Sequence, residues 1–150
     1  MIRNKSFILI SIGILVIVSV CFFSNGSNND EIKLLEIKTH QNYNEKSSDN
    51  KYIIKDKKEL EKFFSLYYKI DETSNVDLDK NTIFIQTVSK GSGSISLKIR
   101  DVIFKNDTVI LDIEEDSPEF GTTDMAYWIL IAVVPNGKLN NLTCSDWTTL

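Results

Sequence analysis

The chain has 150 residues, of which 42% are hydrophobic and 25% are charged. This is the composition of an ordinary globular protein, and the length suits one domain, so disordered and fibrous proteins are excluded. The 21 acidic residues outnumber the 17 basic ones, and every acidic residue lies from position 30 onward. Nucleic acid requires clustered cations on its partner, so an acidic domain of this kind disfavours a nucleic-acid partner.

The first 26 residues have the character of a targeting segment. Arg3 and Lys5 form a short basic region, and residues 7–23 form a mostly apolar stretch. A signal peptide has roughly 7–15 apolar residues and a membrane-spanning helix about 20, so this stretch lies between the two. Three interpretations stay open: a cleaved signal peptide, a membrane anchor, and an atypical lipoprotein signal with Cys21 as the site of lipid attachment. All three place the rest of the chain outside the cytoplasm, because the basic residues hold the N-terminus inside.

Residues 27–50 are predicted to form a linker that contains one candidate strand. Residues 24–31 are polar and rich in turn-forming side chains, as in a tether. Residues 41–50 contain little that a core could bury. Between these two segments, Ile32 and Leu34 begin an apolar pattern that favours a first strand. The folded domain is therefore placed at residues 51–150.

One segment near the start of this domain has a clear helical pattern. After a short strand candidate at residues 51–55, Asp56 and Glu59 have the spacing of a capping box. Leu60, Phe63 and Phe64 then recur at the spacing of one helix face, while charged side chains occupy the other face. The pattern predicts an amphipathic helix over residues 56–70, with its aromatic side chains in the core.

From residue 81 onward the apolar pattern alternates, which is typical of strands. Residues 82–90 place apolar side chains on both faces of one strand. The strand that follows changes its apolar phase at Arg100 and Asp101, which predicts a β-bulge. Asn106 and Asp107 have the chemistry of a two-residue hairpin turn.

The returning strand and a very apolar strand complete this series. Residues 108–115 alternate again and are followed by an acidic loop. The run Met125–Val134 is apolar throughout and stops at Pro135, as a fully buried strand would. The tail beyond it could add one edge strand. The predicted fold is mainly β (α+β), an antiparallel sandwich or open barrel of five to seven strands with the helix covering one end.

The sequence assigns no catalytic, cofactor-binding or metal-binding residue. His40 is the single histidine and has no nucleophile motif near it, so a catalytic triad is disfavoured. Residues 77–81 open like a calcium loop, but the required glycine and glutamate are replaced by Thr82 and Val88. Cys144 is expected to be a small buried residue rather than a reactive thiol.

The later half of the chain resembles the PrcB-like family, named for a subunit of a surface protease complex. The resemblance covers roughly residues 51–138 and rests on the order of IIKDKKELEKFF, VDLDKNTIFIQTVSKGSGSISLKI, TVILDIEEDSP and DMAYWILIAVVP. Members typically carry Gly-Gly-Tyr after the first glycine turn, where this chain has residues 92–94, Ser-Gly-Ser. The resemblance implies an exported, often lipid-anchored accessory domain that assembles with or stabilises an enzyme, and it supplies no catalytic residues.

These observations predict a non-enzymatic exported or membrane-tethered protein that binds a partner protein, such as an exported protease. The alternative is a small-ligand or enzyme-inhibitor binding module of the cell envelope, in which the acidic loop and Tyr127 or Trp128 line a groove. A hydrolase that uses paired carboxylates is a third and weaker hypothesis. The predicted contact surface is the loop before the apolar strand and the start of that strand, with these residues: Glu119, Phe120, Thr122, Asp124 and Tyr127.

Overall fold

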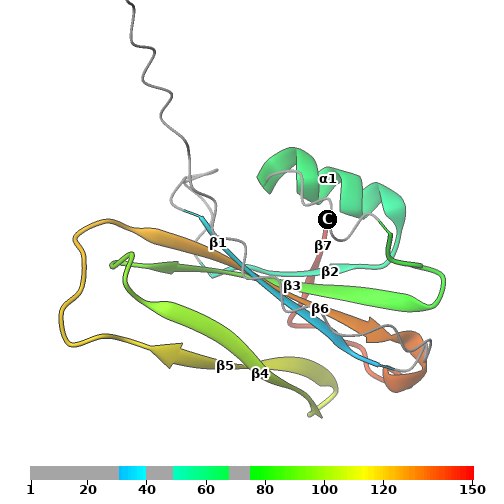
Figure 1. The fold of residues 1–150 in the computed structure, drawn as a ribbon. Helices are drawn as coiled ribbons and strands as arrows, with labels where there is room; N and C mark the ends of the chain where they lie inside the picture. The colour runs from blue at the N-terminus through cyan, green and yellow to red at the C-terminus, as the bar shows by residue number, and fades with distance from the viewer. Residues whose placement is uncertain (1–30, 40–48, 68–74) are drawn as a thin grey trace, which may run out of the picture.

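The structure is a computed structural model that describes residues 31–39, 49–67 and 75–150. Within these ranges the chain forms one α-helix, one short 3-10 helix and seven strands (Figure 1). Residues 1–26, including Cys21, and the single histidine, His40, lie outside the described residues. No helix in the described part of the chain is long and apolar enough to cross a membrane. The elements are β1 (Lys33–Thr39), β2 (Lys51–Ile54), α1 (Lys57–Tyr67), β3 (Asn81–Lys90), β4 (Ser96–Lys105), β5 (Thr108–Asp116), β6 (Ala126–Pro135), η2 (Asn136–Lys138) and β7 (Thr148–Thr149).

The strands form two open sheets. The larger sheet has the order β1-β6-β3-β2-β7, and the smaller one is the hairpin β4-β5. All pairs are antiparallel except β2 and β7, which run parallel. The predicted fold class, a mainly β domain of five to seven strands with one helix, is confirmed, and the sheets do not close into a barrel.

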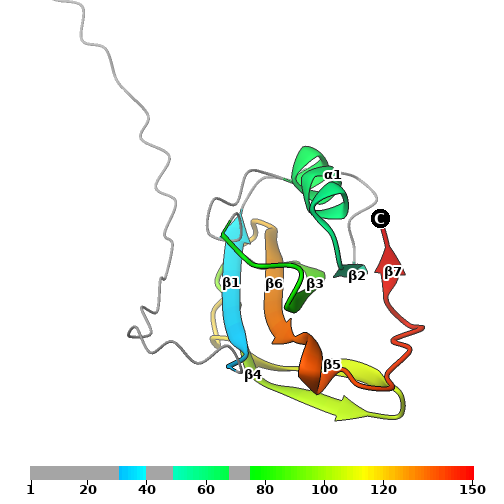
Figure 2. The same ribbon diagram turned by 90° about the vertical axis from the view of Figure 1, so that its right-hand side faces the viewer.

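The central strand β6 is apolar throughout because both of its faces are covered. Ile129, Ile131 and Val133 point to the side of α1 and join a core layer with Phe63. The residues between them point to the β4-β5 hairpin and form a second layer that includes Trp128. Helix, large sheet and hairpin are therefore three stacked layers, and Figure 2 shows α1 and β4-β5 on opposite sides of the large sheet. The prediction that the helix covers one end of the domain is wrong, since the helix covers a face of the large sheet.

The helix begins as its sequence pattern predicts. Asp56 Oδ1 accepts a hydrogen bond from Glu59 N at 2.9 Å, which satisfies one of the free amides of the first turn. The side chain of Glu59 reaches back to Lys55 N at 2.7 Å, one residue before the cap. Leu60 and Phe63 are buried against the large sheet, so the apolar face of the helix lies where the pattern placed it.

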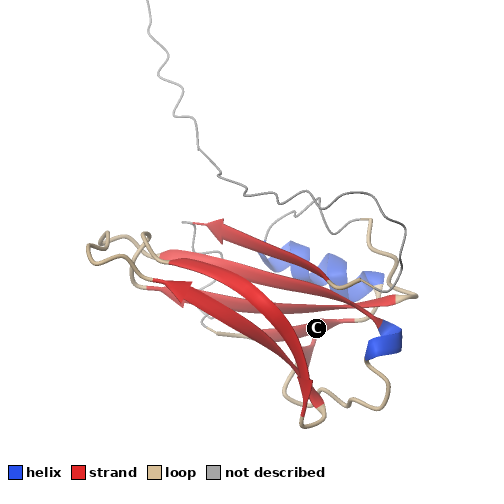
Figure 3. Ribbon diagram, turned by 60° about the horizontal axis from the view of Figure 1, so that its bottom comes forward, coloured by secondary structure: helices blue, strands red, loops and turns tan. Residues whose placement is uncertain are grey.

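Local features of the β4-β5 hairpin also follow the sequence. The register shifts between Ile99 and Asp101, so Arg100 is the extra residue of a bulge. Asn106 and Asp107 form the turn with φ values of 53° and 64°, a left-handed conformation that these two residue types tolerate. Figure 3 shows the two strands of the hairpin curving across the large sheet, and a bulge increases such local bending.

Side chains of β1 join the hairpin to one edge of the large sheet. Glu36 accepts a hydrogen bond from the backbone N–H of Ile99 at 2.9 Å, next to the bulge. Lys38 donates to the carbonyl oxygens of Gly93 and Ile95, the second at 3.3 Å. β1 supplies these bonds and pairs with β6 along its whole length, so the candidate strand predicted within residues 27–50 is a strand of the large sheet.

The C-terminal segment joins the hairpin to the other edge. Trp147 Nε1 donates to Val109 O of β5 at 2.9 Å, and Cys144 N donates to Asp107 O at 3.0 Å. The ring of Trp147 packs edge-on against Phe84 of β3 with centroids 4.9 Å apart. The tail adds the short edge strand β7, as predicted.

A substitution of Trp128 tests how much the core layer between the two sheets contributes to stability. Its side chain is 8% exposed, so Trp128→Asp would bury a charge and remove a large packing group. We expect the free energy of unfolding, measured by urea titration and circular dichroism, to fall by at least about 3 kcal/mol. Ile103→Asp is the matched control, because Ile103 is 39% exposed on the hairpin. A Trp128→Asp variant as stable as this control would contradict the assignment of Trp128 to the core.

Candidate functional site

The predicted contact surface lies at one end of the sheets, in the loop that joins β5 to β6. Within it Phe120 is 86% exposed and Met125 is 50% exposed. Glu119, Thr122 and Asp124 are also exposed, whereas Tyr127 is half-buried. Four of the predicted residues therefore lie on one loop and Tyr127 lies on β6 next to it, with Phe120 as the most exposed large apolar side chain of the loop.

This loop is fastened to the loop between β3 and β4. Ser94 Oγ accepts a hydrogen bond from Thr122 N at 3.0 Å and donates to Thr122 Oγ1 at 3.2 Å. Ser92 Oγ lies 3.5 Å from the same hydroxyl oxygen. Lys38 in turn fixes the β3-β4 loop from β1. The sequence gives no sign of this contact, because a hydrogen bond between two loops 28 residues apart leaves no local pattern.

The two loops also pack closely at glycine residues. A methyl group on Gly93 would overlap the carboxylate of Asp124, and one on Gly121 would lie 2.8 Å from Ser92 Oγ. Gly91, by contrast, has open space around it. We call the exposed parts of residues 91–95 and 117–125 the loop-end surface.

The two aromatic residues beside this surface do not form a common groove. Trp128 is buried in the layer under the hairpin, with Lys38 Nζ 5.5 Å from its ring centroid. Tyr127 precedes it on β6 and therefore points to the opposite face of the sheet. Its hydroxyl lies 3.8 Å from Met125 Sδ.

Several acidic side chains near the loop end are paired with cations. Glu115 accepts a hydrogen bond from Lys90 Nζ at 2.6 Å, which is the main reason that the pKa of Glu115 is lowered. Asp112 is bound by the guanidinium of Arg100, whose pKa is raised by this contact. Among the described residues, no three metal-ligating side chains come close enough to hold a metal ion.

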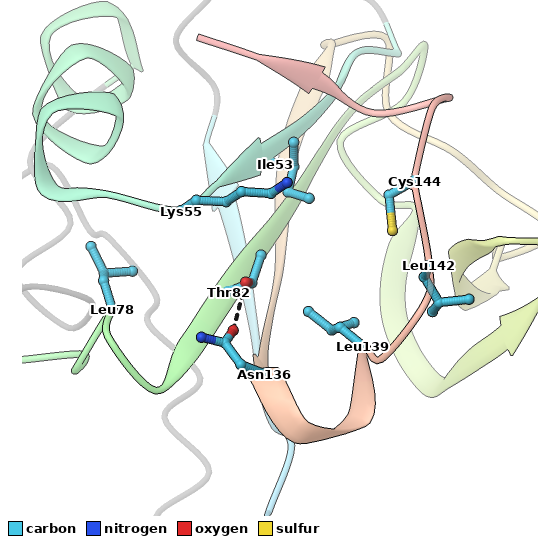
Figure 4. A pocket seen from close by; sticks show the side chains of 8 residues that line it. All are labelled: Ile53, Lys55, Leu78, Thr82, Asn136, Leu139, Leu142 and Cys144. Carbon is cyan, nitrogen blue, oxygen red and sulfur yellow. Dashed lines mark hydrogen bonds between the residues drawn. The ribbon is translucent and has the colours of Figure 1, made fainter.

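A pocket of about 260 Å³ lies at the opposite end of the sheets (Figure 4). Thr82 at the start of β3 and Asn136 after β6 form its polar part through a 2.8 Å hydrogen bond. The C-terminal segment contributes Leu139, Leu142 and Cys144 as a largely apolar wall. Lys55, beyond the end of β2, and Ile53 and Leu78 complete the lining. Sequence reasoning missed this pocket because its residues come from separate segments that carry no shared motif.

Cys144 faces this pocket as a neutral thiol. It is 5% exposed and not disulfide-bonded, which agrees with the expectation of a small buried residue. Burial is the largest influence on its pKa and raises it, and the nearby charge of Lys55 opposes this effect only in part. A raised pKa leaves little thiolate at neutral pH, so the environment does not activate this cysteine as a nucleophile.

Comparison of the chain with protein-family models, with curated proteins and with solved structures found no match.

Gly93→Ala tests the packing of the two loops. The added methyl group must displace the carboxylate of Asp124, so we expect faster amide hydrogen exchange across residues 121–125. Gly91→Ala is the matched control and should leave exchange unchanged, since nothing lies within 4 Å of the new methyl group. Equal exchange in both variants would contradict the close contact between the loops.

The hydrogen bonds between Thr143 and Asp107 should make the stability of the protein depend on pH. Asp107 accepts hydrogen bonds from the backbone and hydroxyl of Thr143, and these bonds lower the pKa of Asp107. A lowered pKa in the folded state stabilises the protein above the unfolded value of about 4, and this stabilisation is lost as the pH falls through the folded pKa. Asp107→Asn should therefore reduce the fall in the urea midpoint of unfolding between about pH 6 and pH 3. Thr143→Val should reduce this fall as well, because it removes the hydroxyl donor. An unchanged pH dependence of the midpoint in both variants would contradict the role given to these hydrogen bonds.

Proposed function

We propose that this protein is a non-enzymatic, exported or membrane-tethered accessory protein that binds a partner protein through the loop-end surface. The observation that carries the proposal is the 86% exposure of Phe120 on a loop that Ser94 and Thr122 fasten to its neighbour. The basic and apolar N-terminal segment supports the export part of the proposal.

An exposed aromatic side chain on a loop that is held in place is well suited to protein recognition. Burying a phenylalanine contributes about 1.5–3 kcal/mol, and aromatic side chains form many of the strongest contacts in protein interfaces. The hydrogen bonds between Ser94 and Thr122 hold the loop in place before binding. Little conformational entropy is then lost when the partner binds, so more of the contact energy appears as affinity.

The charges around Phe120 indicate the kind of partner. Glu119, Asp116 and Asp124 are exposed near it, and Met125 adds a second exposed apolar side chain. A complementary surface would place an apolar pocket against Phe120 and basic residues around it. Such a charge pattern increases the rate of association and selects among partners. The resemblance to the PrcB-like family makes an exported protease the class of partner to test first.

The alternative, a ligand groove between the acidic loop and the aromatic residues of β6, has less support. Such a groove needs Tyr127 or Trp128 in its lining, but Trp128 is buried and only the half-buried Tyr127 lies beside the loop. The hydrolase hypothesis draws on the carboxylates of residues 114–124, of which Glu115 is already bound to Lys90. Protein binding is therefore the better explanation of this end of the molecule.

Photo-crosslinking tests the proposed contact directly. A photoreactive amino acid at position 120, in the full chain in its own membranes, should give one discrete adduct with an exported protein. The same amino acid at position 103, which is also exposed on the hairpin but less so (39% for Ile103 against 86% for Phe120), is the control and should not give that adduct. Met125→Ser should reduce the adduct at position 120 at least about threefold, since it removes neighbouring apolar contact area.

Two results would contradict the proposal. One is an equal adduct from positions 120 and 103, which would show that the contact is not specific to the loop end. The other is the absence of any adduct at position 120 when the variant is expressed and folded. Thermal unfolding of each variant, followed by circular dichroism, separates loss of contact from loss of fold.

A further inference from the structure

The pocket at the opposite end of the sheets has walls that are held open by the fold. The chain leaves β6 at Pro135, turns through η2 and returns along the hairpin. Cys144 N and Thr143 N bind the turn residue Asp107 at 3.0 Å each, and the Trp147 indole binds β5. These bonds fix the C-terminal wall at a set distance from β3, so the space between them does not depend on a bound molecule.

The wall of the pocket is mostly apolar and partly exposed. Leu139 and Leu142 pack against the layer under the hairpin but remain only half-buried, and Ile53 is 4% exposed behind them. Figure 4 shows the Leu139 side chain directed toward Thr82, with Leu142 and Cys144 farther along the same C-terminal segment. Exposed apolar surface in a preformed pocket favours a ligand with an apolar chain.

The polar part of the pocket consists of a hydrogen-bonded pair, Thr82 and Asn136, and one lysine, Lys55. Thr82 donates its proton to Asn136 Oδ1 at 2.8 Å, and Asn136 Nδ2 donates to Asp79 O at 3.2 Å, so these groups largely satisfy one another. Lys55 is the one cation of the lining, and its ammonium group forms no ion pair with any described residue. Figure 4 shows the Lys55 side chain extended along the pocket above Thr82.

We propose that this pocket binds a small amphipathic carboxylate, with its apolar chain against Leu139 and Leu142 and its carboxylate on Lys55. The volume of about 260 Å³ suits a small ligand rather than a large one. The ammonium group supplies a charge-assisted hydrogen bond that an uncharged chain cannot accept equally well. The thiol of Cys144 lines the same space.

Cys144 provides a built-in reporter for this site, because a bound chain covers its sulfur. The probe is octanoate, added below its micelle concentration to the full chain in phospholipid nanodiscs. Alkylation of Cys144 by N-ethylmaleimide is followed by peptide mass spectrometry, so that Cys21 does not interfere. At ten times its Kd, octanoate should slow alkylation about tenfold, because only the unoccupied protein reacts. It should also raise the Tm.

Uncharged and oppositely charged probes test the role of Lys55. Octan-1-ol and octylamine have the same chain as octanoate but no carboxylate, and each should need at least about tenfold higher concentration for equal protection. Lys55→Met should remove the preference for octanoate, whereas Lys55→Arg should keep it. The exposed position of Lys55 makes both variants suitable for comparison with the natural protein.

The proposal is overturned if octanoate neither slows alkylation nor raises the Tm of the natural protein. It is also overturned if octanol protects Cys144 as well as octanoate does. The same holds if octanoate protects Cys144 in the Lys55→Met variant as well as in the natural protein. Leu142→Trp, which fills the space, should abolish protection, and its Tm shows whether it is folded. Phe120→Ser should leave octanoate binding unchanged, so this site and the loop-end surface can fail independently.

Discussion

The fold depends on one constraint: β6 is apolar on both faces, so both faces must be kept from water. The helix covers Ile129, Ile131 and Val133, and the hairpin covers Trp128, Leu130 and the other residues of alternate phase. A single sheet with one cover would leave about half of this strand exposed, at a cost of roughly 25 cal/mol for each Å² of apolar surface. β1 and the C-terminal segment hold the hairpin against the large sheet.

The hairpin cover is held by side chains rather than by a continuous ladder of backbone hydrogen bonds. Glu36 and Lys38 bind it along β1, and Trp147 binds it along the C-terminal segment. The layer beneath it contains one buried polar atom, Trp128 Nε1, with no hydrogen-bond partner among the described residues. An unsatisfied buried donor costs about 1–3 kcal/mol, so this layer contributes less than its apolar area alone would give.

Local patterns in the sequence predicted the elements well, because each depends on neighbouring residues. Asp56 and Glu59 marked the helix start, the phase change at Arg100 marked the bulge, and the loop with Phe120 was placed before β6. Contacts between distant segments could not be predicted in this way. The bond of Ser94 to Thr122 and the pocket around Lys55 depend on strand order, which alternation of apolar residues does not reveal.

The direction of β1 places the start of the first described strand at the same end of the large sheet as the pocket. Lys33 pairs with Val133, near the pocket, and Thr39 pairs with Tyr127, near the loop-end surface. The ten residues of β6 separate these two ends by roughly 30 Å at about 3.3 Å per residue. The start of β1 and the pocket therefore share one end of the large sheet, and Phe120 lies at the other end, so one of the two surfaces can be occupied without covering the other.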